Sequence, residues 1–308
     1  MAKTLRAGVI GSGVFGGYHA GKYVAANGAD LAAVFDVDAG AAKAGGEKHG
    51  VPGYDNLEHF LSAVDIVTIA SPAATHFKMA KACLSVGKPI LIEKPIAHSL
   101  EEARALTALA EEKNLMLAIG HQERLVFDAM GLLDAPESPL AIKAARMGPW
   151  SPRGSDVSVT LDLMVHDADL VLALFGRPKA TQITANATAE KTKFPDAITT
   201  DIEFDGRQRA QLTASRIHGE RERHMEIIYP SGTLKIDFVA RTFENNTGFA
   251  LNENYADTPG GQDPLGANVQ HFIDAVTGKR KRPAVTGQEG LEALALILAI
   301  DEAAGFKL

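Results

Sequence analysis

The chain has 308 residues, of which 46% are hydrophobic and 22% charged, a composition typical of a globular protein long enough for two domains. The chain has 31 Lys and Arg residues and 38 Asp and Glu residues. The resulting net charge of −7 argues against a general nucleic-acid or anionic-membrane binder. One basic cluster at 279–282 lies between a glycine and a proline, and we interpret it as a solvated turn.

Cysteine content and hydropathy exclude further classes. The single cysteine, Cys83, cannot form an internal disulfide, and no cysteine-rich ligand set predicts a metal site. The longest apolar run, at 293–300, is too short to span a bilayer. No secretory signal precedes the first predicted strand, so the sequence predicts a cytoplasmic protein.

Strand and helix patterns alternate along the first 120 residues. Short apolar runs predict buried strands at 5–10, 30–35, 65–70, 89–92 and 115–119. Helical patterns lie between them, at 15–27, 39–49, 75–86 and 99–113. This alternation predicts an α/β fold whose N-terminal domain, residues 1–121, is a Rossmann doubly wound parallel sheet.

The pattern changes in residues 122–308, which we predict to form a second domain. Helices are expected at 123–133 and 159–175, followed by strands at 181–189, 197–204, 209–215, 224–229 and 233–238. The stretch 245–268 has little pattern and predicts a loop, and two helices at 268–276 and 288–304 end the chain. Together these predict a C-terminal α+β domain with an open, mostly antiparallel sheet.

A glycine-rich turn follows the first predicted strand. It reads Gly11-Ser12-Gly13-Val14-Phe15-Gly16 and opens a predicted helix. In a dinucleotide site the first glycine permits the tight turn, the second lets the backbone approach the pyrophosphate, and the third lets helix and strand pack closely. The helix N-terminus then offers free N–H groups to the phosphates. The alternative is a glycine-rich turn without a ligand.

Asp36 ends the second predicted strand, twenty residues after Gly16. A carboxylate at this position accepts hydrogen bonds from the ribose hydroxyls and repels a 2′-phosphate. Val37 and Asp38 follow, with no adjacent Arg or Lys to hold such a phosphate. The sequence therefore favours NAD over NADP.

Three further residues form a candidate catalytic set. Lys94, in Glu93-Lys94-Pro95, follows the strand at 89–92, where a parallel sheet binds its ligand, and could stabilise a developing alkoxide. Asp162 and His166 are four residues apart and share one face of a predicted helix. Histidine suits proton removal near neutral pH, and the carboxylate could orient the ring or bind a substrate hydroxyl.

Each of these residues has a simpler interpretation. Lys94 could be a surface lysine near a turn, and the Asp162–His166 pair an ordinary helix-surface contact or half of a metal site. No other cluster completes such a metal site. A nucleotide-sensing regulator that has lost catalysis is also possible in principle, but the presence of Lys94, Asp162 and His166 favours an enzyme.

Together these motifs resemble the Gfo/Idh/MocA family of oxidoreductases over essentially the whole chain. Lys94 matches the lysine of the family's Glu-Lys-Pro motif, and Asp162 and His166 match its Asp-x-x-x-His pair. Ser71, Pro72 and His76 are similar to the segment beside the nicotinamide half of the cofactor. The resemblance implies an NAD(P)-dependent dehydrogenase of a sugar, cyclitol or related polyol, with substrate binding and homodimer or homotetramer contacts in the second domain.

A narrower resemblance concerns the UDP-N-acetylglucosamine 3-dehydrogenase branch and related sugar-nucleotide enzymes. It is carried by 120–124, 148–153 and 159–167, although Leu125-Val126-Phe127 replaces the branch's usual Phe-Asn-Pro. It implies a cofactor contact by Gln122, and it makes Arg124 and Arg153 candidate diphosphate or carboxylate partners. Those two arginines could equally bridge the domains, and a free-sugar or inositol dehydrogenase remains the alternative.

Overall fold

The computed structural model describes residues 4–152 and 154–306, which fold into two compact units. Unit 1 contains the described residues up to Leu125 together with Gln262–Leu291. Unit 2 contains Val126–Gly261 and the described residues from Glu292 onward. The sequence placed one boundary, between residues 121 and 122, whereas in the structure a C-terminal segment returns to unit 1.

Unit 1 is built on a six-stranded, fully parallel sheet in the order β3-β2-β1-β4-β5-β6. This is the strand order of the dinucleotide-binding fold. The strands are β1 (Leu5–Ile10), β2 (Ala29–Phe35), β3 (Gly53–Tyr54), β4 (Ile66–Ile69), β5 (Ile90–Ile92) and β6 (Leu117–Ile119). The helices are α1 (Val14–Ala25), α2 (Ala39–His49), α3 (Leu57–Ala63), α4 (His76–Ser85), α5 (Leu100–Glu112) and α9 (Pro264–Val276).

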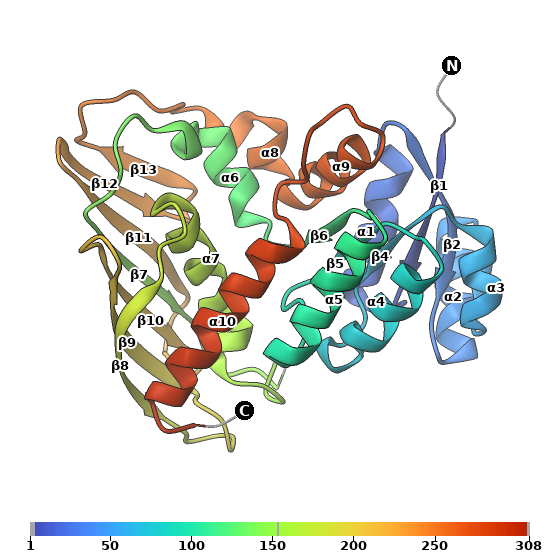
Figure 1. Cartoon of the computed structure of the whole chain (residues 1–308), viewed down its shortest axis with the longest axis horizontal. Helices are drawn as coiled ribbons and strands as arrows, with labels where there is room; N and C mark the ends of the chain where they lie inside the picture. The colour runs from blue at the N-terminus through green and yellow to red at the C-terminus, as the bar shows by residue number, and fades with distance from the viewer. Residues whose placement is uncertain (1–3, 153, 307–308) are drawn as a thin grey trace. The chain divides into compact units, whose positions relative to one another are not determined.

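Helices cover both faces of this sheet (Figure 1). On one face, α1 and α9 pack together, and Phe272 of α9 joins a core with Val9 and Leu91 of the sheet. On the other face, a Cβ atom at Gly8 would lie 2.5 Å from the ring of Phe60 in α3, so only glycine fits there. The apolar side of α9 thus completes the core of unit 1, to which the segment Gln262–Leu291 belongs.

Unit 2 is built on a seven-stranded sheet in the order β13-β12-β11-β7-β10-β9-β8. All neighbours are antiparallel except β7 and β10, which are parallel. The strands are β7 (Ala141–Met147), β8 (Ala180–Thr188), β9 (Ala197–Phe204), β10 (Arg209–Ser215), β11 (Glu222–Tyr229), β12 (Gly232–Asp237) and β13 (Thr242–Asn245). The predicted open, mostly antiparallel sheet is confirmed.

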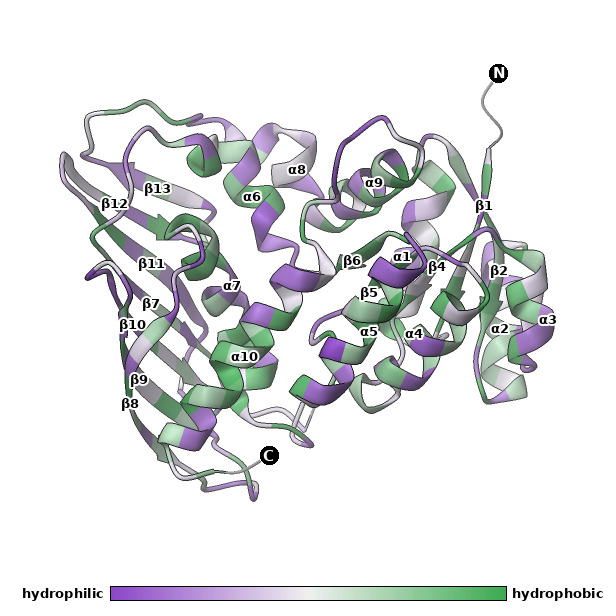
Figure 2. Cartoon of the chain, viewed as in Figure 1, coloured by the Kyte–Doolittle hydropathy of each residue, from purple (hydrophilic) through white to green (hydrophobic). Residues whose placement is uncertain are grey.

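Hydrophobic and hydrophilic residues alternate along strands of this sheet (Figure 2). Because successive side chains of a strand point to opposite faces, this pattern makes one face of the sheet apolar. Along β9, Ile198, Thr200, Ile202 and Phe204 are buried and the residues between them are not. The buried face packs against helix α7 (Val165–Leu174), and α10 (Gly287–Ala303) contributes its later turns to unit 2. Helix α6 (Glu123–Met130) spans the change from unit 1 to unit 2.

The loop predicted for 245–268 is wrong over its second half. Residues Tyr255–Asp257 form a 3₁₀ turn, and α8 (Pro259–Gln262) and the first turns of α9 lie within the stretch. The start of α9 has a local cause: the carboxylate of Asp263 accepts a hydrogen bond from the Gly266 N–H, and proline occupies the first turn. The predicted helix at 159–175 begins as a π-helical turn, Thr160–Met164, before α7.

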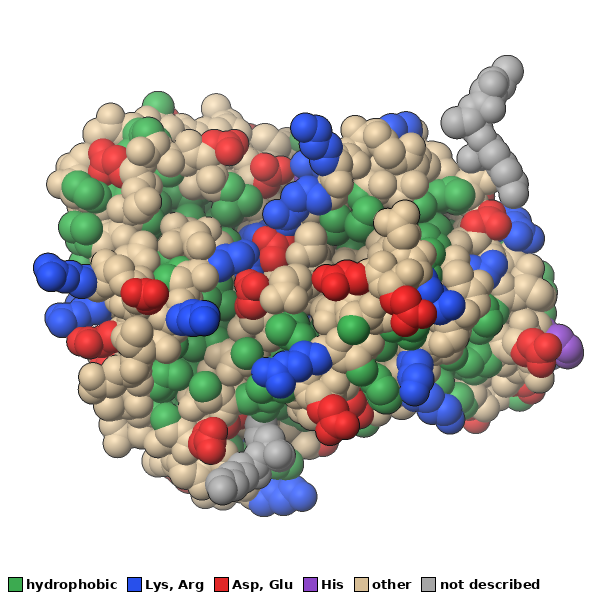
Figure 3. Space-filling view, in the orientation of Figure 1, with side chains coloured by type: hydrophobic (Ala, Val, Ile, Leu, Met, Phe, Trp, Pro, Cys, Tyr) green, Lys and Arg blue, Asp and Glu red, His purple; other side chains and the backbone are tan. Residues whose placement is uncertain are grey.

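The surface carries both signs of charge. On the face drawn in Figure 3, acidic and basic side chains are interspersed. No helix among the described residues has both the length and the apolar character needed to cross a membrane. Within 4–152 and 154–306, no three His, Cys, Asp or Glu side chains gather as a metal ion would require.

Candidate functional site

The carboxyl ends of the parallel strands bring the predicted cofactor residues of unit 1 to one edge. The register aligns Ile10, Ile69, Ile92 and Ile119 as the last residues of β1, β4, β5 and β6. The residues that follow these strands therefore lie along the same edge. They include the glycine turn, Ser71, the Glu93–Lys94 pair and Gln122.

The glycine turn is constrained by close backbone contacts. Gly11 has a φ of +98°, and a Cβ atom there would lie 2.7 Å from the Ser71 backbone nitrogen. A Cβ at Gly16 would overlap the Gly11 carbonyl oxygen, so the helix packs directly on the turn. By contrast, apart from its neighbours in the chain, no atom of the described residues lies within 4 Å of a Cβ built at Gly13, which begins α1 without a side-chain cap.

The other residues of the turn differ in exposure. Val14 is 70% exposed, and the Phe15 ring stands edge-on to Tyr18, with 5.9 Å between the ring centroids. The backbone N–H of Ser12 donates to Asp36 at 2.8 Å. An uncapped helix start behind an open glycine fits a diphosphate, which would accept hydrogen bonds from the free N–H groups of that start.

Asp36 lies after β2, as predicted, and its carboxylate organises the turn around it. One oxygen accepts from Ser12, and the other accepts from the backbone N–H of Asp38 at 3.1 Å. Ionised carboxylates have further acceptor positions on each oxygen, so ribose hydroxyls could still donate to this group. Asp36 therefore couples the glycine turn to the end of β2.

His76 links two loops at the same edge. Its ring is buried, with Nδ1 2.7 Å from the Pro95 carbonyl oxygen and Nε2 2.9 Å from the Ser71 carbonyl oxygen. Burial lowers the pKa of His76, although both carbonyls favour the protonated ring. A neutral ring donates to only one of them. His76 thus connects the Ser71–Pro72 loop to the segment after Lys94. Within that loop, the hydroxyl oxygens of Ser71 and Thr75 lie 2.7 Å apart.

Glu93 is buried beside the candidate catalytic lysine. Its Oε1 lies 2.7 Å from Nε2 of His19 on α1 and accepts from the Gln122 side-chain amide at 3.2 Å. Burial alone would raise the pKa of Glu93, but the hydrogen bond and charge of His19 and the charge of Lys94 lower it below its usual range. A buried carboxylate thus lies directly before Lys94, which is half-buried and precedes a cis peptide bond to Pro95.

In unit 2, Asp162 lies on the π-helical turn and His166 on the first turn of α7. From Ser158 to Leu172 every residue is buried except Asp162, Leu163 and His166. These three therefore form the accessible strip of an otherwise buried helical segment. π-Helical turns are rare and occur frequently at functional sites.

The two predicted substrate arginines are Arg124 and Arg153. Arg124 is 5% exposed, and its Nη1 lies 3.6 Å from Oε1 of Glu289, so much of its charge faces a carboxylate within unit 1. Arg153 lies outside the described residues.

Several buried polar partners have no pattern in the sequence that singles them out. His19 follows Gly16 by three residues in α1, and only the structure shows that it meets Glu93. Arg146 of β7 makes a buried ion pair with Asp167, with 2.8 Å between Nη2 and Oδ1, directly after His166. Two signals in the sequence could have pointed to these partners. One is a histidine, His19, one helical turn after the glycine motif, and the other is an arginine, Arg146, in an otherwise mostly apolar strand.

Known proteins resemble both halves of the chain. Residues 5–121 match the oxidoreductase family with an NAD-binding Rossmann fold, and residues 140–235 match the GFO/IDH/MocA C-terminal domain. UDP-N-acetylglucosamine 3-dehydrogenase of Acidithiobacillus ferrooxidans is 33% identical over 289 residues, 90% of each chain. The NAD⁺-dependent scyllo-inositol 2-dehydrogenase of Bacillus subtilis is 30% identical over 70% of this chain and 68% of its own.

Solved structures give the same relationship. A structure of the Acidithiobacillus ferrooxidans UDP-N-acetylglucosamine 3-dehydrogenase aligns with a TM-score of 0.89, at 32% identity and 98% coverage of both chains. A scyllo-inositol dehydrogenase of Lactobacillus casei with bound NAD(H) and scyllo-inositol shares the fold, with a TM-score of 0.80 at 20% identity over 98% of this chain and 97% of its own. With an NAD-binding first domain and the matching C-terminal domain, the chain belongs to the Gfo/Idh/MocA family of oxidoreductases.

Proposed function

We propose that this protein is an NAD-dependent dehydrogenase that oxidises a ring hydroxyl of a sugar nucleotide to a ketone, with the 3-hydroxyl of UDP-N-acetylglucosamine as the first substrate to test. The observation that carries the proposal is the 33% identity to a UDP-N-acetylglucosamine 3-dehydrogenase over 90% of both chains. Asp36 favours NAD over NADP as the cofactor because its carboxylate would repel a 2′-phosphate.

Three side chains have separate roles in this proposal. Bound NAD⁺ supplies the hydride acceptor. The Lys94 ammonium donates a hydrogen bond to the reacting oxygen and stabilises negative charge that develops there. His166 accepts the hydroxyl proton, and Asp162 orients the imidazole and stabilises the charged form that results. The accessible strip of Asp162 and His166 on a buried segment supports these roles.

The cofactor residues in the proposal are those at the carboxyl edge of the parallel sheet. Residues 11–16 and Asp36 hold the adenosine and diphosphate portion, and Ser71, Pro72, His76, Glu93, Lys94 and Gln122 lie toward the nicotinamide. We assign Arg124 and Arg153 to the anionic part of the substrate. The carboxylate of Glu289 balances part of the charge of Arg124. The Arg124→Ala variant therefore measures how much the remaining charge contributes to substrate binding.

A free-sugar or inositol dehydrogenase is the second candidate. It is favoured by the 30% identity to a scyllo-inositol 2-dehydrogenase over 70% of this chain. The same lysine and histidine chemistry would serve either substrate, because both present a secondary ring hydroxyl. The uridine diphosphate group of a sugar nucleotide, which carries negative charge, distinguishes it from a free sugar or an inositol.

One substrate screen separates these candidates. NADH formation is followed with UDP-N-acetylglucosamine, UDP-glucose, N-acetylglucosamine, glucose, myo-inositol and scyllo-inositol at equal concentrations. The proposal expects UDP-N-acetylglucosamine to give the highest kcat/KM, and expects Arg124→Ala to lower that value more than the value for any free sugar. Equal or higher values for a free sugar or an inositol would select the second candidate. NAD binding without turnover of any substrate would favour a nucleotide-sensing regulator.

The homodimer or homotetramer and the cytoplasmic location stay predictions from the sequence. Light scattering of the purified protein tests the first, and cell fractionation tests the second.

A further inference from the structure

The connection between β8 and β9 in unit 2 is organised by a buried carboxylate. Asp196 is fully buried, and its Oδ2 accepts hydrogen bonds from the backbone N–H groups of Glu190, Lys191 and Thr192 at 2.6 to 3.0 Å. Burial alone would raise the pKa of Asp196, but these N–H groups and Arg216 lower it well below its usual range. The carboxylate is therefore a fixed negative charge in the interior of unit 2.

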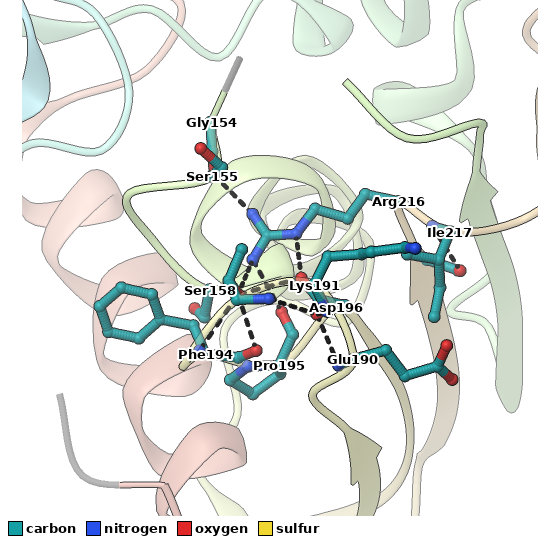
Figure 4. Close-up of polar contacts among 12 residues, drawn as sticks. Gly154, Ser155, Ser158, Glu190, Lys191, Phe194, Pro195, Asp196, Arg216 and Ile217 are labelled. Atoms are coloured by element: carbon teal, nitrogen blue, oxygen red, sulfur yellow. Dashed lines mark hydrogen bonds and ion pairs between the residues drawn. The ribbon is translucent and has the colours of Figure 1, made fainter. Parts of the chain in front are cut away.

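Arg216, which follows β10, spreads its guanidinium over this connection and over a second loop (Figure 4). Its Nε donates to Asp196 at 2.8 Å, and its Nη2 donates to the Thr192 hydroxyl at 3.0 Å and to the Pro195 carbonyl at 3.2 Å. Its Nη1 donates to the carbonyl of Gly154. Lysine could not make this fan, because it lacks the planar set of five N–H donors.

The second loop adjoins Asp162. Gly154 has a φ of +74°, and a Cβ atom there would lie 2.5 Å from Oδ2 of Asp162. Five residues later, the Val159 N–H donates at 2.9 Å to the same Pro195 carbonyl that accepts from Arg216. Arg216 and its acceptors thus hold both ends of the segment 154–159, which leads into the π-helical turn that carries Asp162.

The Arg216 side chain is buried beside an aromatic ring. Arg216 is 4% exposed. Its guanidinium carbon, Cζ, lies 5.9 Å from the centroid of the Trp150 ring. Removing water from two opposite charges has a cost that good geometry must offset. One of the hydrogen bonds of Arg216 goes to Gly154, in the loop beside the candidate catalytic carboxylate of Asp162.

We propose that Arg216 is a positioning residue: through its hydrogen bond to Gly154 and its shared acceptor at Pro195, it holds the segment 154–159 against Asp162 and so fixes the position of that carboxylate for substrate. The proposal rests on the proposed function in assigning Asp162 to the reaction. It adds that the orientation of Asp162 is set from the β8–β9 connection, whose Asp196 lies 34 residues after Asp162 in sequence.

The first test compares Arg216→Lys with Arg209→Lys, an exposed arginine on β10 whose partner is Glu203 on the surface. The substrate is whichever compound of the screen the wild type oxidises fastest. Arg216→Lys is expected to lower kcat/KM about 10- to 100-fold, as a misplaced catalytic group does, with the Kd of NADH unchanged. Arg209→Lys is expected to match the wild type. Wild-type kcat/KM in folded Arg216→Lys would overturn the proposal.

A double-mutant cycle with Asp162→Asn distinguishes positioning from general loosening. If Arg216 acts through Asp162, Arg216→Lys should have little further effect on kcat/KM when Asp162 is already Asn. Losses that multiply would mean that Arg216 acts elsewhere, and would overturn the proposal. If Arg216→Lys does not fold, Thr192→Val takes its place in the cycle, because it removes the hydroxyl that accepts from Nη2 of Arg216 and leaves Arg216 and Gly154 unchanged.

Hydrogen exchange provides a test that needs no substrate. Amides of 154–159 are expected to exchange faster in Arg216→Lys than in the wild type, and at the wild-type rate in Arg209→Lys. Unchanged exchange in Arg216→Lys would overturn the positioning role. If no compound in the screen is oxidised, the proposed function fails while this measurement still decides whether Arg216 holds the segment.

Discussion

At the scale of single residues, Lys94 offers the most direct test of the proposed chemistry. Lys94→Ala is expected to lower kcat about 10²- to 10³-fold, the usual effect of removing one donor to a developing oxyanion. The Kd of NADH, measured by its fluorescence, should stay near the wild-type value because the glycine turn and Asp36 are intact. Lys78→Ala, on the exposed side of α4, is the matched control. Turnover near that of the control would remove Lys94 from the mechanism.

Asp36 is the residue that should set the cofactor preference. Asp36→Asn keeps the shape of the side chain and one acceptor for the Ser12 N–H, but it removes the negative charge. We expect weaker binding of NAD⁺, by about 10-fold for one charge-assisted hydrogen bond, and a smaller gap between NAD⁺ and NADP⁺. Titration of both nucleotides into both proteins measures this. An unchanged ratio of the two affinities would contradict the assignment.

His166 should control the response of the rate to pH. Proton removal needs a neutral imidazole, so kcat for oxidation should rise with pH between about pH 5 and 8. His166→Asn should abolish most of the activity together with this ionisation, while NADH affinity is retained. Asp162→Asn should be milder if the carboxylate only orients the ring. Persistence of the ionisation in His166→Asn would make Lys94 the candidate base.

At the scale of elements, the π-helical turn before α7 is anchored from α10. Oδ2 of Asp301 accepts hydrogen bonds from Ser158 Oγ at 2.8 Å and Thr160 Oγ1 at 2.7 Å, and all three residues are buried. Burial raises the pKa of Asp301, and the two hydroxyl donors only partly oppose the shift. The start of the segment that carries Asp162 and His166 therefore depends on a carboxylate 143 residues after Ser158 in the chain.

The raised pKa of Asp301 predicts a pH-dependent difference in stability. A group with a raised pKa in the folded state contributes stability that is fully present below its unfolded pKa and is lost as pH rises through its folded pKa. Thermal unfolding of the wild type and Asp301→Asn should therefore be compared from neutral pH to about pH 4, near the ordinary pKa of aspartate. The Tm of the wild type should gain on that of Asp301→Asn as pH falls. A constant difference would show that Asp301 does not titrate differently on folding.

At the scale of the whole molecule, cofactor binding should appear as a gain in stability. A ligand present at 100 times its Kd stabilises the state that binds it by about 2.7 kcal/mol. NAD⁺ should raise the Tm seen by calorimetry, and NADP⁺ at the same concentration should raise it less. Equal shifts for both nucleotides would contradict the preference assigned to Asp36.

Local patterns predicted many elements of both units closely, and the exceptions have physical causes. The strand at 209–215 was predicted with the observed bounds, because apolar and polar residues alternate along it. Strand β7 was missed because Arg146 occupies a buried position, where its charge is balanced by Asp167. Strand β3 has two residues and helix α3 seven, too few for a clear period.

The sequence by itself determined the features that depend on neighbouring residues: the parallel sheet, the glycine turn, Asp36 after β2, and the Asp162–His166 spacing. Tertiary structure decided which partner each buried carboxylate meets. Glu93 with His19, Asp196 with Arg216 and Asp301 with Ser158 pair across 20 to 143 residues of chain. A buried carboxylate must find a donor, but the sequence shows only the charge and not the partner that folding brings to it. The same holds for α9, whose apolar face shows that it packs but not which unit it completes.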